Sequence, residues 1–241
     1  IIGDVRDLDF LKKSVVEAKP EVIIHMAAQP LVRYSYTNPV ETYMTNVMGT
    51  VHLFESALAT ESVRAVLNVT TDKCYENQER EEGYKEHEPM GGHDPYSNSK
   101  GCSELVTSAY RKSFFAKRGI GLASARAGNV IGGGDWALDR LIPDIVRAVY
   151  NNEKVIIRNH QSTRPWQHVL EPVGGYLSLV EGLYDNKPGY AEGFNFGPNS
   201  NDNCSVDHII QLLNKYWDGR VNYEIINSDQ NPHEAKLLSL D

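Results

Sequence analysis

The sequence predicts an α/β fold in which helices cover both faces of a parallel sheet. Short apolar runs of strand length alternate with amphipathic runs of helix length, the pattern of repeated βαβ units. The strand-length runs are apolar throughout instead of alternating with polar residues, which is typical of strands buried on both faces. Together these two observations favour a doubly covered parallel sheet.

Three strands are expected in this sheet. Glu21–Ala28 (EVIIHMAA) and Ala65–Thr71 (AVLNVTT) are continuous apolar runs. Gly121–Gly134 (GLASARAGNVIGGG) is a weaker third candidate, because glycine lowers the stability of a strand interior.

Two long helices are expected between these strands. The first follows Asn38 and Pro39, where asparagine can cap the helix and proline suits its first turn. Asp94-Pro95 opens the second helix in the same way, and it runs over Tyr96–Phe115. The residues expected to face the sheet from the first helix recur at helical spacing: Tyr43, Val47, Val51, Phe54 and Leu58.

The remainder, from about Gly132 onward, predicts a smaller C-terminal lobe over the strand ends. It contains a helical run, LIPDIVRAVYN, and a short strand, KVIIR. The sequence shows neither internal repeats nor a low-complexity tract.

The composition excludes several classes of function. With 32 acidic and 24 basic residues the net charge is -8, which argues against a broad surface for nucleic acid or anionic membranes. No apolar run approaches the roughly 20 residues of a membrane span. The three cysteines, Cys74, Cys102 and Cys204, are odd in number and widely spaced, so we expect no disulfide framework, no metal site and a reducing cytoplasm.

Tyr96 and Lys100 form a candidate proton-transfer pair. They are four residues apart on the second helix, so their side chains point the same way from successive turns. A nearby ammonium lowers the pKa of a phenol from about 10, which makes the pair a proton acceptor near neutral pH. Alone the spacing is weak evidence, because a surface Tyr/Lys pair is the alternative.

The ends of the first two strands supply the context for this pair. Ligands of open parallel sheets bind beyond the carboxyl ends of the strands, where Thr71, Asp72 and Lys73 stand. After the earlier strand, the small Ala27 and Ala28 allow a flat ligand to approach the backbone. The sequence therefore predicts one site at this edge.

A series of motifs resembles the extended short-chain dehydrogenase/reductase family over essentially the whole chain. The resemblance implies a Rossmann-type sheet, NAD as cofactor and a nucleotide sugar as substrate. The motifs, in order, are GDVRD, HMAAQP, TNVMGT, TTDK, YSNSK, ARAGNVIGGGDW and RPWQHVLEP.

Longer strings resemble the 4,6-dehydratases of this family that act on CDP-D-glucose. These strings are TTDKCYEN, PMGGHDPYSNSKG, ARAGNVIGGGDWALDRLIPD and PHEA. The implied lyase oxidises sugar C4, eliminates water across C5 and C6, and returns hydride to C6, giving CDP-4-dehydro-6-deoxy-D-glucose. Such products enter bacterial cell-surface sugars such as the O-antigen of lipopolysaccharide.

The resemblance also implies a role for each catalytic residue. Tyr96 takes the C4 hydroxyl proton, Lys100 binds the nicotinamide ribose and acidifies Tyr96, and Thr71 binds the C4 oxygen. Asp72 protonates the leaving C6 hydroxyl, and burial favours the protonated form that this requires. Lys73 either removes the C5 proton, for which it must be neutral, or stabilises the enolate as a cation; the sequence leaves both open.

Binding residues carry over from the same motifs. Arg164 is expected at the pyrophosphate of the substrate, because a guanidinium binds two phosphate oxygens at once, and Asn129 at a phosphate or the sugar. His233 and Glu234 stand where relatives have a nucleotide-binding arginine, which leaves the base contacts open. His25 is expected to be a packed strand residue. The residues expected to bind NAD are Asp4, Val5, Met26, Ala27, Ala28, Thr45, Tyr96 and Lys100.

The resemblance further implies a homodimer or larger homo-oligomer, and a discontinuous division of the chain. Residues 1–130 and 165–196 are expected to form a partial NAD-binding domain, and residues 131–164 and 197–241 the nucleotide-sugar lobe. The start, IIGDVRD, reads as the middle of an open reading frame, without the first strands and Gly-rich turn of the family. The alternatives are another nucleotide-sugar enzyme, such as a 4-epimerase, and a non-catalytic fragment.

Overall fold

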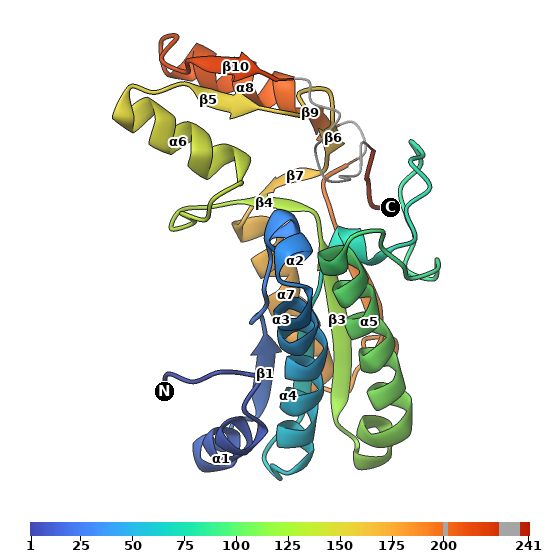
Figure 1. Cartoon of the computed structure of the whole chain (residues 1–241). Helices are drawn as coiled ribbons and strands as arrows, with labels where there is room; N and C mark the ends of the chain where they lie inside the picture. Colours follow the sequence, from blue (N-terminus) through green and yellow to red (C-terminus); the bar gives the residue numbers. More distant parts are fainter. Residues whose placement is uncertain (200–201, 227–236) are drawn as a thin grey trace.

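A four-stranded parallel sheet lies at the centre of the protein (Figure 1), in the strand order β1-β2-β3-β8. The structure is a computed structural model that describes residues 1–199, 202–226 and 237–241. The strands of this sheet are β1 Val22–His25, β2 Ala65–Val69, β3 Gly121–Ala127 and β8 Gly193–Phe196. The predicted α/β fold with a parallel sheet is confirmed.

The strands are shorter than their apolar runs. β1 and β2 end two to three residues before the predicted ends, so residues 26–28 and 70–71 lie in loops at the carboxyl edge. The predicted third strand is divided into two strands at Gly128. The chain passes close to Pro165 at this point, since a β-carbon on residue 128 would lie 2.4 Å from Pro165 Cγ. After the break, β4 (Asn129–Ile131) pairs with β7 (Trp166–His168) outside the central sheet.

Helices cover both faces of the sheet, and successive residues of β2 face opposite cores. Val66 packs in one core with Phe54 and Phe115, while Leu67 packs in the other with Leu179 and Leu183. The helices of the first face are α4 (Gly49–Leu58) and α5 (Pro95–Tyr110), α7 (Leu170–Tyr184) covers the second, and α1 (Leu8–Ala18) packs on α4.

The first long helix departs from its prediction in two ways. It is divided into α3 (Pro39–Tyr43), a π-helical segment (Met44–Met48) and α4. The predicted Asn38 cap is wrong, because the Asn38 side chain donates to the Thr37 hydroxyl at 2.9 Å and makes no cap hydrogen bond.

The face that this helix buries is more polar than predicted. Of the five apolar residues expected to face the sheet, only Phe54 is fully buried. Thr42, Asn46 and Thr50 are buried in place of the others toward the end of the helix nearest the predicted site. They are accommodated because they hydrogen-bond to neighbouring buried polar groups, such as the backbone of Gln29.

The second long helix begins as predicted. The Asp94 carboxylate accepts a hydrogen bond of 2.9 Å from the backbone N–H of Ser97, and Pro95 occupies the first turn. α5 continues into a π-helical segment, Arg111–Phe115, and a 3₁₀ turn, Ala116–Arg118. This cap fixes the start of the helix at the carboxyl edge of the sheet, next to Tyr96.

A smaller lobe lies above the carboxyl ends of the strands (Figure 1), although α7 and β8, which also follow Gly132, belong to the central sheet and its cover. It has a separate apolar core around Ile145, Ile157 and Ile210. The short helix α2 (Val32–Thr37) approaches the same region from the sheet side. The elements of the lobe are α6 Leu141–Asn151, β5 Val155–Ile157, β6 Thr163–Arg164, β9 Cys204–Ser205, α8 Val206–Tyr216 and β10 Tyr223–Ile225.

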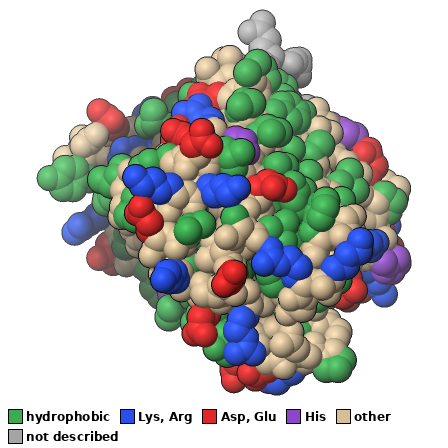
Figure 2. All heavy atoms as spheres, turned by 90° about the horizontal axis from the view of Figure 1, so that it is seen from below, with side chains coloured by type: hydrophobic (Ala, Val, Ile, Leu, Met, Phe, Trp, Pro, Cys, Tyr) green, Lys and Arg blue, Asp and Glu red, His purple; other side chains and the backbone are tan. Residues whose placement is uncertain are grey.

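The described part of the chain has no helix long and apolar enough to cross a membrane. Within the same residues no group of three or more His, Cys, Asp or Glu side chains could hold a metal ion. On the face seen in Figure 2, acidic and basic side chains are interspersed and form no continuous field of one sign. The three cysteines are free thiols.

Candidate active site

A cavity of about 600 Å³ lies where the carboxyl edge of the sheet meets the smaller lobe. Both parts of the fold line it, because strand-end residues such as Thr71 and lobe residues such as Arg164 contribute to its wall. The predicted site residues that line it are Met26, Thr71, Lys73, Tyr96, Asn129 and Arg164.

The strand-end turn, defined here as residues 70–75, carries the predicted elimination pair. Thr71 caps a 3₁₀ turn, Asp72–Cys74. The Thr71 hydroxyl donates to Asp72 Oδ1 at 2.9 Å and accepts from the backbone N–H of Lys73 at 3.4 Å. The turn thus brings a hydroxyl, a carboxylate and an amine together directly after a buried strand.

Asp72 is completely buried behind the cavity wall. Its Oδ1 accepts from Thr71 and from Lys73 Nζ at 3.2 Å, whereas its Oδ2 has no hydrogen-bond partner. A buried polar oxygen without a hydrogen-bond partner is uncommon in folded proteins, and a catalytic role is one reason for it. Lys73 is 23% exposed and lines the cavity, so the ammonium bridges Asp72 and the open space.

Tyr96 meets this turn from the first turn of α5. Its backbone N–H donates to the Ser35 hydroxyl at 3.1 Å, and its phenol makes a hydrogen bond with the Thr71 side chain. Burial raises the pKa of Tyr96 to about 12, and the nearby Asp72 adds to the rise. The Thr71 hydrogen bond and the positive charge of Arg140 act in the opposite direction.

Lys100 lies one turn further along α5 and is buried. Its ammonium donates to the carbonyl oxygen of Val69 at 3.1 Å. Burial lowers the pKa of Lys100 to about 8, against the opposing effects of Glu104 and Cys74. That Lys100 lowers the pKa of Tyr96 stays a prediction, since the resolved influences that lower this pKa are the Thr71 hydrogen bond and the charge of Arg140.

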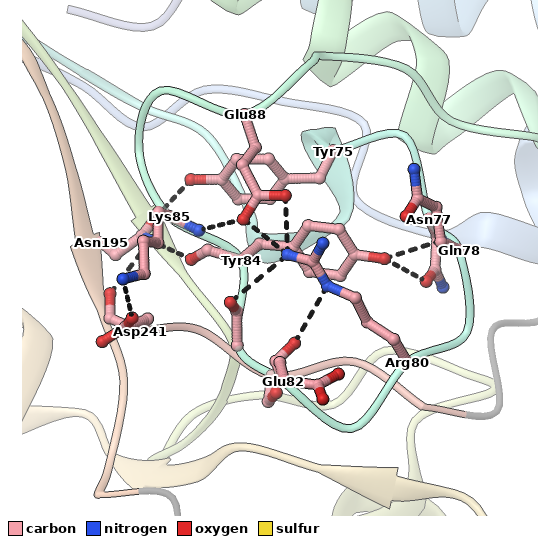
Figure 3. A network of polar contacts seen from close by, with 12 residues as sticks. Tyr75, Asn77, Gln78, Arg80, Glu82, Tyr84, Lys85, Glu88, Asn195 and Asp241 are labelled. Carbon is pink, nitrogen blue, oxygen red and sulfur yellow. Dashed lines mark hydrogen bonds and ion pairs between the residues drawn. The ribbon is translucent and has the colours of Figure 1, made fainter.

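The far end of the strand-end turn is anchored by a polar cluster, shown in Figure 3. The Tyr75 hydroxyl donates to Asn195 Oδ1 at 2.6 Å, and Asn195 Nδ2 donates to the carbonyl oxygen of Tyr84 at 2.7 Å. The rings of Tyr75 and Tyr84 stack with centroids 5.2 Å apart. Asn195 belongs to β8, and Asp241 also accepts from its amide at 3.3 Å, so three distant segments meet at the end of the turn.

A second cavity of about 390 Å³ adjoins the first, since Pro30 and Leu31 line both. Three residues predicted to bind cofactor, Asp4, Ala28 and Thr45, line it. Together the two cavities offer an extended path along the edge of the sheet, which suits a long dinucleotide.

The remaining predicted cofactor residues lie outside this path. Val5, Ala27 and Lys100 line neither of the two cavities. The carbonyl oxygen of Val5 lies 3.0 Å from His52 Nδ1, and its side chain approaches Gly49 on α4. The Asp4 carboxylate is ion-paired with Arg6 at 2.6 Å, and the hydrogen bonds from Arg6 lower the pKa of Asp4 to about 2.

The predicted substrate residues line the first cavity from β4 and β6. The Asn129 side-chain oxygen is buried without a hydrogen-bond partner, and Arg164 is 8% exposed and donates to the carbonyl oxygen of Thr163 at 2.9 Å. The segment Pro232–Ala235 lies outside the described residues. His25 is packed as expected, and burial lowers its pKa to about 4.

Sequence reasoning missed Arg140 and Arg33, which also line the first cavity. Arg140 precedes α6 and favours the ionised form of Tyr96, while Arg33 Nε lies 3.9 Å from the Asp139 carboxylate. No regular spacing relates Arg140 to Tyr96, since they are on different parts of the fold. Only the closure of the lobe over the sheet brings them together.

This fold is the Rossmann-type α/β fold that solved nucleotide-sugar dehydratases and epimerases share. The chain belongs to the family described as GDP-mannose 4,6 dehydratase, which it matches over residues 1–218.

Known relatives are similar over the whole chain. CDP-glucose 4,6-dehydratase from Salmonella typhimurium is 55% identical over 245 residues, which cover 100% of this chain and 68% of the relative. DesIV, a dTDP-glucose 4,6-dehydratase from Streptomyces venezuelae solved with NAD and TYD bound, has a TM-score of 0.80 at 23% identity, covering 99% of this chain and 69% of DesIV.

An epimerase shares the same fold. UDP-glucuronic acid 4-epimerase from Bacillus cereus, solved with NAD, has a TM-score of 0.83 at 21% identity, covering 100% of this chain and 72% of the epimerase. The fold is therefore common to dehydratases and epimerases, and the residues of the strand-end turn have to distinguish them.

Proposed function

We propose that the protein is a NAD-dependent lyase that converts CDP-D-glucose into CDP-4-dehydro-6-deoxy-D-glucose. The observation that carries this proposal is that Thr71, Lys73 and Tyr96 line one cavity, with Asp72 buried directly behind its wall, in a chain 55% identical to a CDP-glucose 4,6-dehydratase. An epimerase has no leaving group at C6, so it does not need the acid and amine of this turn.

The two adjoining cavities fit NAD. Asp4, Ala28 and Thr45 would hold the adenosine and phosphate portions, and Met26 and Tyr96 the portion nearer the strand-end turn, with Lys100 buried one helix turn behind Tyr96. When bound, NAD supplies the acceptor for the C4 hydride and the donor that returns it to C6. Val5 and Ala27, which line neither cavity, would contribute through the backbone that shapes the path.

Tyr96 and Thr71 act at the C4 oxygen of the sugar. Tyr96 takes the hydroxyl proton, and Thr71, already hydrogen-bonded to Tyr96, donates to the oxygen as negative charge develops. Lys100 supports the same phenol from the next turn and binds the ribose of the cofactor. Because burial raises the pKa of Tyr96, the charges of Lys100 and Arg140 and the Thr71 hydrogen bond must offset that cost.

Asp72 and Lys73 act on C5 and C6 once C4 is a ketone. Asp72 would supply the proton that the departing C6 hydroxyl needs, and its Oδ2 makes no hydrogen bond within the described residues. Lys73 contacts both Asp72 and the cavity, so it is placed either to remove the C5 proton or to stabilise the enolate.

Arg164, Asn129 and Arg140 bind the nucleotide portion of the substrate. Arg164 offers a planar set of donors for the pyrophosphate, and the free oxygen of Asn129 can accept from a sugar or ribose hydroxyl. Arg140 adds positive charge beside Tyr96, where it can attract the negatively charged phosphates of the substrate.

The reaction is tested by incubating the full-length protein with CDP-glucose and NAD. We expect a base-stable keto-sugar absorbance and a mass loss of one water in the sugar nucleotide. CDP-galactose as the only product would establish the 4-epimerase alternative, and an unchanged substrate would overturn the proposed function.

The role of Lys73 is tested separately by Lys73→Met, which removes the amine and keeps the length of the side chain. If Lys73 is the base, the exchange of the C5 hydrogen with deuterated solvent is lost. Normal exchange with slower product formation would assign Lys73 to enolate stabilisation.

Three broader features complete the proposal. The domains divide as 1–130 with 165–196 and 131–164 with 197–241, in line with the separate apolar cores.

Copies of the chain associate through the helices around TNVMGT and YSNSK, where Val40, Met44, Met48 and Leu105 are exposed at 38–76%. The three free thiols agree with a cytoplasmic location.

A further inference from the structure

A buried ion pair lies directly behind the strand-end turn. Arg126 Nη2 donates to Glu104 Oε2 at 2.8 Å, and the side chains are 7% and 4% exposed. Arg126 is on β3 and Glu104 on α5, and neither lines either cavity. Any influence of this pair on the reaction therefore passes through other residues.

Glu104 holds the beginning of the turn. The Thr70 hydroxyl donates to Glu104 Oε1 at 2.5 Å, and the Ser124 hydroxyl donates to Oε2 at 2.7 Å. Thr70 is the residue directly before Thr71. Both carboxylate oxygens are thus engaged by the strand ends that carry the site.

Arg126 holds the other end of the turn. Its Nη1 donates to the Tyr75 hydroxyl at 2.7 Å and to the carbonyl oxygen of Glu86 at 2.9 Å. Tyr75 is the last residue of the turn, and its hydroxyl continues into the cluster of Figure 3. One ion pair therefore connects both ends of the segment that contains Asp72 and Lys73.

Glu104 also shares a helix face with the proton-transfer pair. Tyr96, Lys100 and Glu104 are four residues apart in succession, so they point the same way from consecutive turns of α5. The geometry between Tyr96 and Lys100 is set by the helix itself. The position of the turn relative to that helix is set by contacts, and the Glu104–Arg126 pair makes contacts at both of its ends.

We propose that Glu104 and Arg126 are positioning residues that hold Asp72 and Lys73 against Tyr96 for the elimination step. This inference rests on the proposed function. Loosening the pair lets the turn shift while the helix keeps its own geometry. Elimination needs Asp72 and Lys73 of the turn, whereas oxidation at C4 uses Tyr96 on the helix and draws on the turn only through Thr71, so elimination is slowed more than oxidation.

The test uses Glu104→Gln in the full-length enzyme, which keeps the shape and removes the charge. In single-turnover mixing with CDP-glucose, we expect reduced-nicotinamide absorbance to form at a rate within about twofold of wild type, whereas keto-product formation falls about 10- to 100-fold. The matched control is Glu88→Gln. Glu88 forms an ion pair with Arg80 at 2.5 Å in the loop that follows the turn and makes no hydrogen bond to residues 70–75. We expect this control to change neither rate.

Glu104→Gln leaves the charge of Arg126 uncompensated in a buried position and can therefore destabilise the fold. Two milder variants at Thr70 avoid this problem. Thr70→Val removes only the hydroxyl that Glu104 accepts from and should reproduce the selective loss of elimination. Thr70→Ser restores that hydroxyl and should recover the wild-type ratio of the two rates.

Amide hydrogen exchange supplies a readout that does not depend on activity. We expect residues 70–75 to exchange faster in Glu104→Gln and Thr70→Val than in wild type, and at the wild-type rate in Glu88→Gln. Equal losses in both chemical steps, or unchanged exchange in the turn, would overturn the positioning role while leaving the proposed function intact. A wild-type enzyme without dehydratase activity would instead refute the proposed function.

Discussion

The ammonium of Lys100 donates a hydrogen bond of 3.1 Å to the carbonyl oxygen of Val69, the last residue of β2. This contact ties the helix that carries Tyr96 to the strand that leads into Thr71. It also places Lys100 in a buried position, where removal from water lowers its pKa to about 8 while Glu104 and Cys74 oppose the shift.

The depressed pKa of Lys100 predicts an alkaline limit to activity. A lysine with a lowered pKa loses its charge as the pH rises through about 8, so a step that needs the ammonium slows above that pH. We expect kcat to fall tenfold per pH unit on that side. Lys100→Arg, which keeps its charge throughout, should retain low activity without the alkaline fall. A profile that stays flat to pH 10 in wild type would contradict this prediction.

Arg140 should control the acidic limb of the pH–activity profile. Its positive charge favours the ionised form of Tyr96, so Arg140→Leu should raise the pKa of Tyr96 further. Because the active form is the ionised phenol, the acidic limb of kcat/KM should move to higher pH. Arg147→Leu is the control, since Arg147 pairs with Asp144 and does not line the cavity. An equal shift in both variants would exclude a specific effect of Arg140.

Asp72→Asn should separate the two halves of the reaction. The amide is nearly isosteric but cannot give up a proton, so we expect dehydration to fall about 10²- to 10⁴-fold while oxidation at C4 persists. The midpoint of thermal unfolding should also fall, because the amide loses the ion pair with Lys73 and buries an N–H2 group where Oδ2 has no partner. Wild-type dehydration by this variant would remove Asp72 from the mechanism.

Arg164→Lys should weaken substrate binding more than it slows the chemical step. Lysine keeps the charge but loses the planar pair of donors, so KM for CDP-glucose should rise about tenfold, the scale of one charged hydrogen bond. Arg158→Lys provides the comparison, because Arg158 is ion-paired with Asp139 at 2.8 Å and does not line the cavity. A lower kcat with unchanged KM would argue against a binding role.

Gly101→Ala should destabilise the protein. Gly101 lies on α5 where a β-carbon would be 2.5 Å from the carbonyl oxygen of Gly91 and 3.1 Å from that of Cys74. Forcing this contact should cost about 1 to 3 kcal/mol in the free energy of unfolding. In contrast, Gly174→Ala on α7, with nothing within 4 Å, should stabilise by up to about 1 kcal/mol. Chemical denaturation of both variants checks the pair, and equal stabilities would contradict the close approach of α5 to the turn.

The elements that sequence predicted best are those fixed by local rules. Asp94 and Pro95 start α5 because a carboxylate beside the first turn accepts an N–H wherever the chain places it. Asn38 does not cap, because its backbone, with φ of -131° and ψ of 57°, is not in the extended conformation from which a cap side chain accepts an N–H. The buried polar face at Asn46 was not predicted, because its partners Gln29 and Ser99 are distant in sequence.

The candidate site was predictable to the extent that its residues lie within one strand end or one helix turn. Thr71, Asp72 and Lys73 are consecutive, and Tyr96 and Lys100 are one turn apart, so chain geometry alone groups them. The contact between the two groups, and the addition of Arg140 to it, depend on packing of the lobe over the sheet.

The sequence by itself determined the parallel sheet and the identities of the groups able to transfer protons, because apolar patterning and short-range spacing are properties of the chain. Tertiary structure alone decided the raised pKa of Tyr96 and the complete burial of Asp72. Both arise only when distant segments exclude water between them, and the same packing brings the charge of Arg140 to Tyr96.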